Sequence, residues 1–97
     1  MSILKTVTSS NITLDQLRTG DSALVVDVLA YDNSEHQSTF DIARRLKELG
    51  FVKGETVRIL HRGYFGGEPL AVRIGQSTFA LRRFEAALIG ITPAGSI

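Results

Sequence analysis

The strongest constraint on the fold of this chain is a change of apolar period that is completed within a few residues. In the first part of this stretch, apolar residues recur at steps of four and three, which predicts an amphipathic helix. They are Ile42, Leu46 and Leu49. In the second part, residues 56–62 (TVRILHR), apolar and polar residues alternate apart from Leu60, which predicts a half-buried strand. The sequence therefore predicts a helix and a strand joined by a short connection.

The connection itself carries the signals of a helix end. Gly50 stands where a helix end accommodates a residue with positive φ, and Phe51 follows it in a position to fold back onto the helix. Residues 52–55 (VKGE) are typical of a turn. We therefore expect the helix to end at Leu49 or Gly50. Three residues near its start are candidate N-caps: Ser38, Thr39 and Asp41.

The N-terminal part of the chain predicts one strand before this helix. Residues 1–11 are mostly polar and are expected to form a loosely held arm. Residues 13–17 (TLDQL) predict one capped helical turn, with Leu14 and Leu17 pointing inward. Residues 22–30 then form an apolar run whose length and β-branched residues favour a strand over a helix.

The C-terminal part predicts further short strands and a tail. The strands are expected over residues 69–74, 78–83 and 88–91, with a single helical turn at 84–87 and a tail at 92–97. The whole pattern predicts a mainly β fold with a helical insertion, a small and partly open barrel of about five strands. The one main helix lies between the first and second strands. A parallel α/β sheet would need more crossover helices.

Composition limits the chain to one domain with one site or surface. The 97 residues fit a single domain, which we place at residues 12–91, without room for a separate catalytic domain. A formal net charge of +1 provides no strong field to attract nucleic acid or an anionic membrane. The absence of cysteine excludes disulfides, thiolate metal sites and cysteine nucleophiles. No apolar run approaches the length of a bilayer span, so we expect no direct membrane insertion.

A polar loop before the helix, at residues 31–38, raises the question of a metal site. Asp32, Glu35 and His36 are potential ligands there. A ferrous or zinc site usually requires several preorganised ligands, and His61, the only other histidine, lies in a strand that nothing in the sequence brings near. A solvated loop is the favoured interpretation, and we expect neither a metal site nor a cofactor.

Glycines frame a second loop at residues 63–69 (GYFGGEP). They are compatible with a phosphate cradle, but neither a Lys-Ser/Thr pair nor a helix follows them. A hairpin connection with Pro69 opening the next strand is therefore favoured. Tyr64 and Phe65 lie at its tip, and we expect one ring to pack on the barrel and the other to be exposed as an anchor for a partner.

The order and spacing of these segments resemble those of the FeoA family. The resemblance rests on RRLKELGFVKGETVRILHR, a glycine-bearing loop, a short strand and LRRFEAALIGI, and it covers residues 13–91. It implies a small cytoplasmic protein of bacterial ferrous iron uptake with an SH3-like β-barrel fold, which acts on the membrane transporter FeoB. The shorter pattern L-x-x-L-G-F/L-x-x-G also occurs in SH3-like domains of iron-dependent repressors. A regulatory domain related to those of metal-dependent repressors is therefore the alternative, although the chain lacks their DNA-binding and metal-sensing portions.

Two other classes of function are less well supported. Residues 42–50 also resemble the first helix and turn of a helix-turn-helix, but residues 52–61 have a strand period where the recognition helix would have to begin. No nucleophile and base pair, paired carboxylates or cofactor fingerprint indicates an enzyme. An arginine acting in trans on the GTP-binding domain of FeoB is a further option, although solvated arginines are favoured. The candidates are Arg44, Arg45, Arg62, Arg82 and Arg83.

The resemblance and the residue patterns together predict a non-enzymatic accessory protein. Its expected partner is a FeoB-like transporter, bound through the GTP-binding or the membrane part, and not nucleic acid. We expect the contact where the helix end meets the barrel, at Arg45, Leu46, Leu49, Tyr64 and Phe65. Leu49 is expected to belong more to the core than to the contact, whereas Leu46 is open to either role. Leu46→Gln should then spare the melting temperature and weaken transporter association, and Leu49→Gln should lower the melting temperature.

Overall fold

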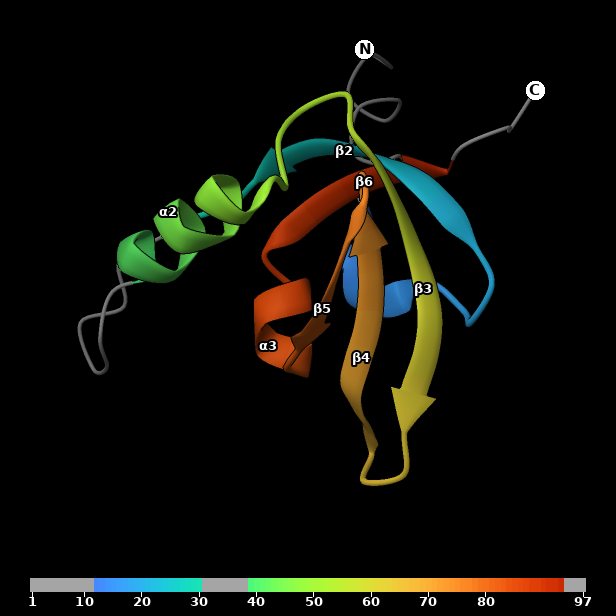
Figure 1. Ribbon diagram of the computed structural model, residues 1–97. Helices are drawn as coiled ribbons and strands as arrows, with labels where there is room; N and C mark the ends of the chain where they lie inside the picture. The colour runs from blue at the N-terminus through green and yellow to red at the C-terminus, as the bar shows by residue number, and fades with distance from the viewer. Residues whose placement is uncertain (1–11, 31–38, 94–97) are drawn as a thin grey trace, which may run out of the picture.

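The computed structural model describes residues 12–30 and 39–93 as a small barrel with one protruding helix (Figure 1). The elements in chain order are β1 (Ile12–Thr13), the 3-10 turn η1 (Leu14–Gln16), β2 (Ser22–Val28), α2 (Phe40–Leu49), β3 (Thr56–Gly63), β4 (Gly67–Ile74), β5 (Ser77–Leu81), α3 (Arg83–Ala86) and β6 (Ile89–Pro93). The predicted mainly β fold with a helical insertion is confirmed. The sequence did not predict β1, because a strand of two residues is too short to show a period.

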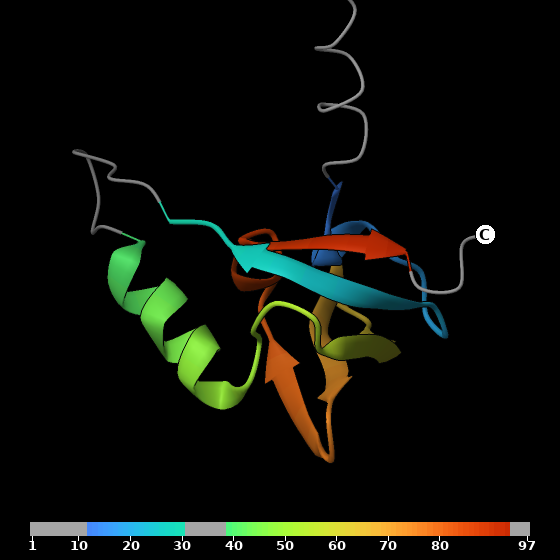
Figure 2. The same cartoon turned by 90° about the horizontal axis from the view of Figure 1, so that it is seen from above.

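All strand pairs of the sheet are antiparallel, and the strands follow the order β1-β6-β2-β3-β4-β5. The last strand, β6, therefore lies between β1 and β2, so that the two ends of the domain are joined in one sheet (Figure 2). The connection from β2 to β3 carries α2, as expected from the sequence. β3 and β4 form one hairpin, and β4 and β5 form the next.

The core is built by alternate residues of these strands. In β3, Val57 and Ile59 are fully buried, and in β4 the buried residues are Leu70, Val72 and Ile74. The two-residue period of each strand thus places one row of side chains inside the barrel and the other in solvent. No polar or charged side chain is buried among the described residues. The described side chains inside the barrel are therefore all apolar.

Leu60 breaks the alternation of β3 because it occupies a β-bulge. Ile59 pairs with Val72, but the next paired residue, His61, lies opposite Ala71, so Leu60 has no partner on β4. The side chain of Leu60 is exposed. An extra residue of this kind bends its strand and resets which side chains face the core beyond it.

The helix α2 ends as the sequence predicted. The amide of Gly50 donates to the carbonyl of Lys47 at 3.1 Å, and the amide of Phe51 donates to the carbonyl of Leu46 at 3.1 Å. This pair of bonds is the Schellman arrangement, in which the residue after the helix has positive φ, and Gly50 has φ 120°. Phe51 is fully buried and its ring lies 6.0 Å from that of Phe79. The helix end and the core are therefore one packed unit.

Gly50→Val is expected to lower the free energy of unfolding by about 1 kcal/mol or more, because a β-branched residue is strained at positive φ. The Cβ itself has room, since at Gly50 it would meet its nearest atom, Cγ1 of Ile74, at 3.9 Å. Thermal melts measure the effect, with Thr78→Val on the exposed face of β5 as control. A wild-type midpoint for Gly50→Val would show that the helix end tolerates another backbone conformation.

The helix α2 lies beside the barrel, next to the end of β2, in both views (Figures 1 and 2). It is attached through the buried side chains of Ala43 and Leu46. Its opposite face is charged and exposed, so the helix contributes one narrow apolar stripe to the core. No helix within the described ranges, 12–30 and 39–93, is long and apolar enough to cross a membrane.

Candidate partner-binding site

The hairpin between β3 and β4 exposes two aromatic side chains at its tip. Tyr64 is 94% exposed and Phe65 is 86% exposed. The expectation that one of these rings packs on the barrel is therefore wrong. The tip extends beyond the core (Figure 1), and its backbone is closed by a bond from the amide of Glu68 to the carbonyl of Phe65 at 3.1 Å. Neither ring reaches the apolar interior from this position.

The two leucines expected at the contact differ in burial, and the expectation that Leu49 belongs to the core is wrong. Leu46 is 2% exposed and belongs to the core, whereas Leu49 is 36% exposed. Just after the helix, Phe51 is fully buried and its amide donates to the carbonyl of Leu46. Leu49 is left at the rim of this packing. Leu46 is thus unavailable to a partner in the folded protein, and Leu49 remains available.

The short helix α3 connects α2 to the hairpin. Arg45 of α2 forms an ion pair with Glu85 of α3 at 3.5 Å. Arg83 of α3 donates from its guanidinium to the carbonyl of Gly66 at 2.9 Å and from its amide to a carboxylate oxygen of Glu68 at 2.7 Å. The two segments that carry the expected contact residues are therefore fixed to the same small helix.

Phe84 of α3 is a further exposed aromatic residue that the sequence analysis did not select. Its side chain is 51% exposed, while Ala86 in the same turn is fully buried. Phenylalanine is among the residue types most often buried, so its identity alone did not indicate that Phe84 lies at the surface. We refer to four exposed side chains, at the end of α2, at the hairpin tip and on α3, as the anchor residues: Leu49, Tyr64, Phe65 and Phe84.

Most of the arginines considered as candidates to act in trans on a GTP-binding domain form hydrogen bonds or ion pairs within the protein. The Arg62 guanidinium donates to the backbone carbonyls of Asp15 and Leu17, and so holds the η1 turn against β3. Arg44 pairs with Asp41 at 3.0 Å, and both side chains are largely exposed. With the bonds of Arg45 and Arg83 described above, these contacts account for four of the five candidates. Arg62 in particular has a structural role.

Three other interpretations of the sequence concern a metal site, a phosphate cradle and a helix-turn-helix. Asp32, Glu35 and His36 lie outside the described residues, and within the described residues no group of three or more His, Asp or Glu side chains is arranged to hold a metal. The glycine loop connects two strands, which is a hairpin and not the strand-loop-helix context of a phosphate cradle. After α2 the chain turns into β3, where a helix-turn-helix would need its second helix.

The family of the chain follows from comparison with known proteins. The FeoA domain matches residues 12–93, which includes every residue that the structure describes. The chain belongs to the FeoA family. Among curated proteins, none matches this chain.

Solved FeoA structures share this fold. FeoA of Stenotrophomonas maltophilia, crystallised with zinc, is 45% identical, with a TM-score of 0.68 over 82% of this chain and 88% of that chain. It is described as a procaryotic SH3 domain protein, for which a role as a bacterial ferrous iron transport activating factor has been suggested. FeoA of Chlorobium tepidum is 29% identical, with a TM-score of 0.70 over 89% and 73% of the two chains. The SH3-like fold expected from the sequence is thus confirmed for this FeoA protein.

The fold also occurs in a manganese-dependent transcriptional repressor. That protein is 22% identical, with a TM-score of 0.66 over 86% of this chain but only 41% of the repressor. At this identity the likeness concerns the fold alone. The similarity to FeoA proteins is stronger and covers most of both chains.

Proposed function

We propose that this FeoA protein is a non-enzymatic accessory protein of bacterial ferrous iron uptake that binds the cytoplasmic part of a FeoB-like transporter. Family membership supports the link to ferrous iron transport. The observation that carries the binding proposal is the exposure of Tyr64 and Phe65, at 94% and 86%, on a hairpin whose backbone is closed by hydrogen bonds. Aromatic side chains presented in this way are the residues that dominate protein interfaces.

The energetic reason is that these rings gain more from a partner than from the free protein. An aromatic side chain buries about 150 Å² or more in an interface, which at about 25 cal/mol per Å² corresponds to about 4 kcal/mol of transfer free energy per ring. The loss of translational and rotational freedom on association opposes this gain. Because α3 fixes the hairpin through Gly66 and Glu68, little backbone ordering remains to be lost on binding.

The proposed contact extends from the hairpin to the helix end. Leu49 and Phe84 add apolar area, and Arg45 adds a cation whose partner, Glu85, is 14% exposed at its side chain while Arg45 is 64% exposed. A charged rim around apolar anchors favours orientation and the rate of encounter more than affinity. In this arrangement the protein acts in the cytoplasm and meets the membrane only through the transporter. Leu46, although included among the contact residues from the sequence, belongs to the core and is not part of this surface.

The test is association of purified protein with the purified cytoplasmic region of a FeoB-like transporter. We expect the double variant Tyr64→Ser, Phe65→Ser to bind at least about tenfold more weakly, because truncation of even one interface anchor costs about 1.4 kcal/mol or more. Its melting temperature is expected to stay at the wild-type value, since both rings are exposed.

Leu24→Ser is the matched control, because Leu24 is an exposed apolar residue of β2, 37% exposed, away from the hairpin. It is expected to bind like the wild type. Equal binding by the double variant and the control would reject the hairpin as the contact. Binding by neither the wild type nor any variant would reject a direct transporter contact.

A further inference from the structure

Two arginines face each other directly on the solvent side of the sheet. In the register of β3 and β4, Arg58 lies opposite Arg73, and Ser22 of β2 lies opposite Arg58 on its other side. The neighbouring residues Val57, Ile59 and Val72 point into the core, so both arginines belong to the outer face. Directly opposed side chains have Cβ atoms about 5 Å apart, so two cationic side chains begin at neighbouring positions of the sheet.

Neither guanidinium has a compensating partner in the described part of the chain. Among residues 12–30 and 39–93, no ion pair or hydrogen bond involves the side chain of Arg58 or Arg73. Like charges directly opposite each other destabilise a sheet. This differs from Arg45, Arg62 and Arg83, each of which contacts a carboxylate or a carbonyl. The free protein therefore carries two uncompensated arginine side chains at neighbouring positions of β3 and β4.

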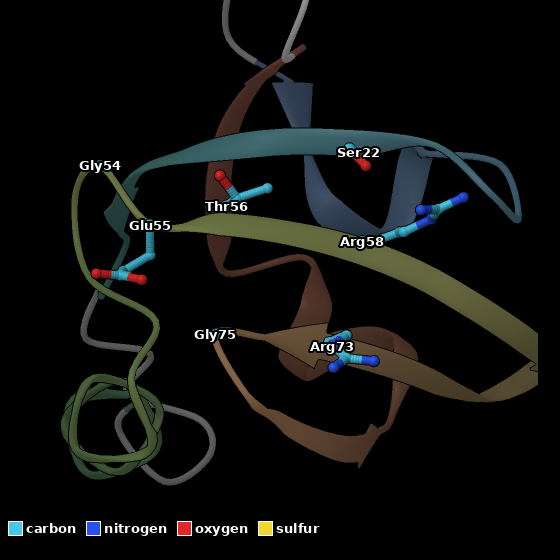
Figure 3. A pocket seen from close by; sticks show the side chains of 7 residues that line it. All are labelled: Ser22, Gly54, Glu55, Thr56, Arg58, Arg73 and Gly75. Carbon is cyan, nitrogen blue, oxygen red and sulfur yellow. The ribbon is translucent and has the colours of Figure 1, made fainter.

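The pair lines a surface hollow of about 360 Å³ (Figure 3). The lining residues are Ser22, Gly54, Glu55, Thr56, Arg58, Arg73 and Gly75. In Figure 3 the two guanidinium groups lie toward one end and the Glu55 carboxylate lies at the other end, with Thr56 between them. The hydroxyl of Ser22 lies on β2 beside Arg58. Positive charge and a hydroxyl group are thus gathered at one end, away from the only carboxylate among the lining residues.

We propose that Arg58 and Arg73 bind a phosphate group, either inorganic phosphate or the phosphate of a small soluble ester, with the Ser22 hydroxyl as a further donor. A phosphate monoester carries nearly two negative charges at neutral pH and three acceptor oxygens, which match two guanidinium groups and a hydroxyl. A single carboxylate would leave one arginine uncompensated. The guanidinium fork also fits phosphate oxygens in a bidentate geometry.

The Glu55 carboxylate restricts what the rest of the ligand contains. A second anionic group at that end would be repelled, whereas a hydroxyl group of the ligand would donate a hydrogen bond to the carboxylate. A phosphate ester of a polyol therefore fits both ends of the hollow. The site lies at the start of β3 and the end of β4, opposite in these strands to the Tyr64 and Phe65 hairpin. It is independent of the proposed transporter contact.

The test is a titration with inorganic phosphate at constant ionic strength, followed by heteronuclear NMR of the backbone amides. We expect saturable changes at Ser22, Arg58 and Arg73. Arg58→Gln and Arg73→Gln should each weaken binding about tenfold or more, since a hydrogen bond to a charged group is lost. Arg82→Gln, at an exposed position outside the hollow, is the control and should bind like the wild type.

A second measurement separates loss of the site from loss of the fold. Without phosphate, the two glutamine variants should melt at or above the wild-type temperature, because the repulsion between the arginines is removed. With phosphate, only the wild type and the control should be stabilised, since a ligand that binds the folded state raises the melting temperature. Changes that do not saturate, or that persist equally in both glutamine variants, would overturn the proposal.

Glycerol phosphate distinguishes the two sources of the phosphate group. Tighter binding of the ester than of the inorganic ion, with the difference lost in Glu55→Gln, would assign a polyol phosphate as the ligand class. Equal affinity for both would assign inorganic phosphate. Both results require the loss of binding in Arg58→Gln and Arg73→Gln.

Discussion

Gly63→Ala is expected to cause the largest loss of stability among alanine substitutions at the glycines that the structure describes. A Cβ at Gly63 would lie 2.0 Å from the carbonyl oxygen and 2.5 Å from the carbonyl carbon of Glu68, and 2.9 Å from Cδ of Pro69. These neighbours are backbone and a proline ring, so no side chain can rotate away. The hairpin between β3 and β4 must open to admit the methyl group. We expect the free energy of unfolding to fall by about 3 kcal/mol or more, at the upper end of the cost of overpacking.

Gly90→Ala is the matched control, because the same methyl group at Gly90 in β6 would meet only the carbonyl oxygen of Asp27, at an ordinary 3.5 Å. Denaturant unfolding of both variants measures the difference. For a domain of this size, 3 kcal/mol corresponds to roughly 12 °C or more in the melting temperature. Equal stability of the two alanine variants would show that the close approach at Gly63 is relieved at no cost.

The sequence predicted those elements that local chemistry specifies. The end of α2 depends on one glycine and the residue after it, and both hydrogen bonds of the expected cap are present at Gly50 and Phe51. The strands β2, β3 and β4 depend on apolar runs or two-residue alternation, which short segments display directly. The turn at residues 14–16 was recognisable from Thr13 and the Gln16 that follows three residues later, which is the pattern of a capping box. In the structure, the side-chain oxygen of Gln16 accepts a hydrogen bond from the amide of Thr13 at 2.9 Å.

The candidate site was harder to predict because its residues are selected by packing between distant segments. Leu46 and Leu49 are both on the apolar side of α2 in the sequence, and the apolar period alone does not indicate which one is buried. Phe84 is exposed because Ala86 takes the inward position of the same turn. These are outcomes of tertiary packing, which no local period contains.

The arginine pair shows the same limit for a sheet. Arg58 faces Arg73 only if the right number of residues is left unpaired between the hairpin and Arg58. The register between β3 and β4 shifts twice in this stretch, at Leu60 and next to Gly63. A slip of one residue would place one of the two side chains on the opposite face. Bulges of this kind leave no signal in sequence beyond a break in alternation, so the hollow lined by these arginines was not predicted.

Leu46→Gln is expected to destabilise the protein strongly, whereas Leu49→Gln is expected to leave its stability nearly unchanged. Leu46 is 2% exposed in a core that contains no polar side chain among the described residues, so a buried amide there would find no side-chain partner. The loss of apolar packing and the unsatisfied amide together should cost about 3 kcal/mol or more. Leu49 is 36% exposed, and its amide variant remains in contact with water. Its effect on the free energy of unfolding should be about 0.5 kcal/mol or less.

The two glutamine variants also separate the core from the proposed contact, in the opposite sense to the expectation from sequence. Leu49→Gln should keep the wild-type melting temperature and weaken association with the transporter region, because it removes an exposed anchor. Leu46→Gln should lose association only to the extent that it unfolds, so binding measured per folded molecule should equal that of the wild type. If Leu46→Gln instead melts like the wild type and binds more weakly, then the helix α2 does not pack on the barrel through Leu46. The contact surface would then include the inner face of α2, and the anchor residues defined by exposure would have to be redrawn.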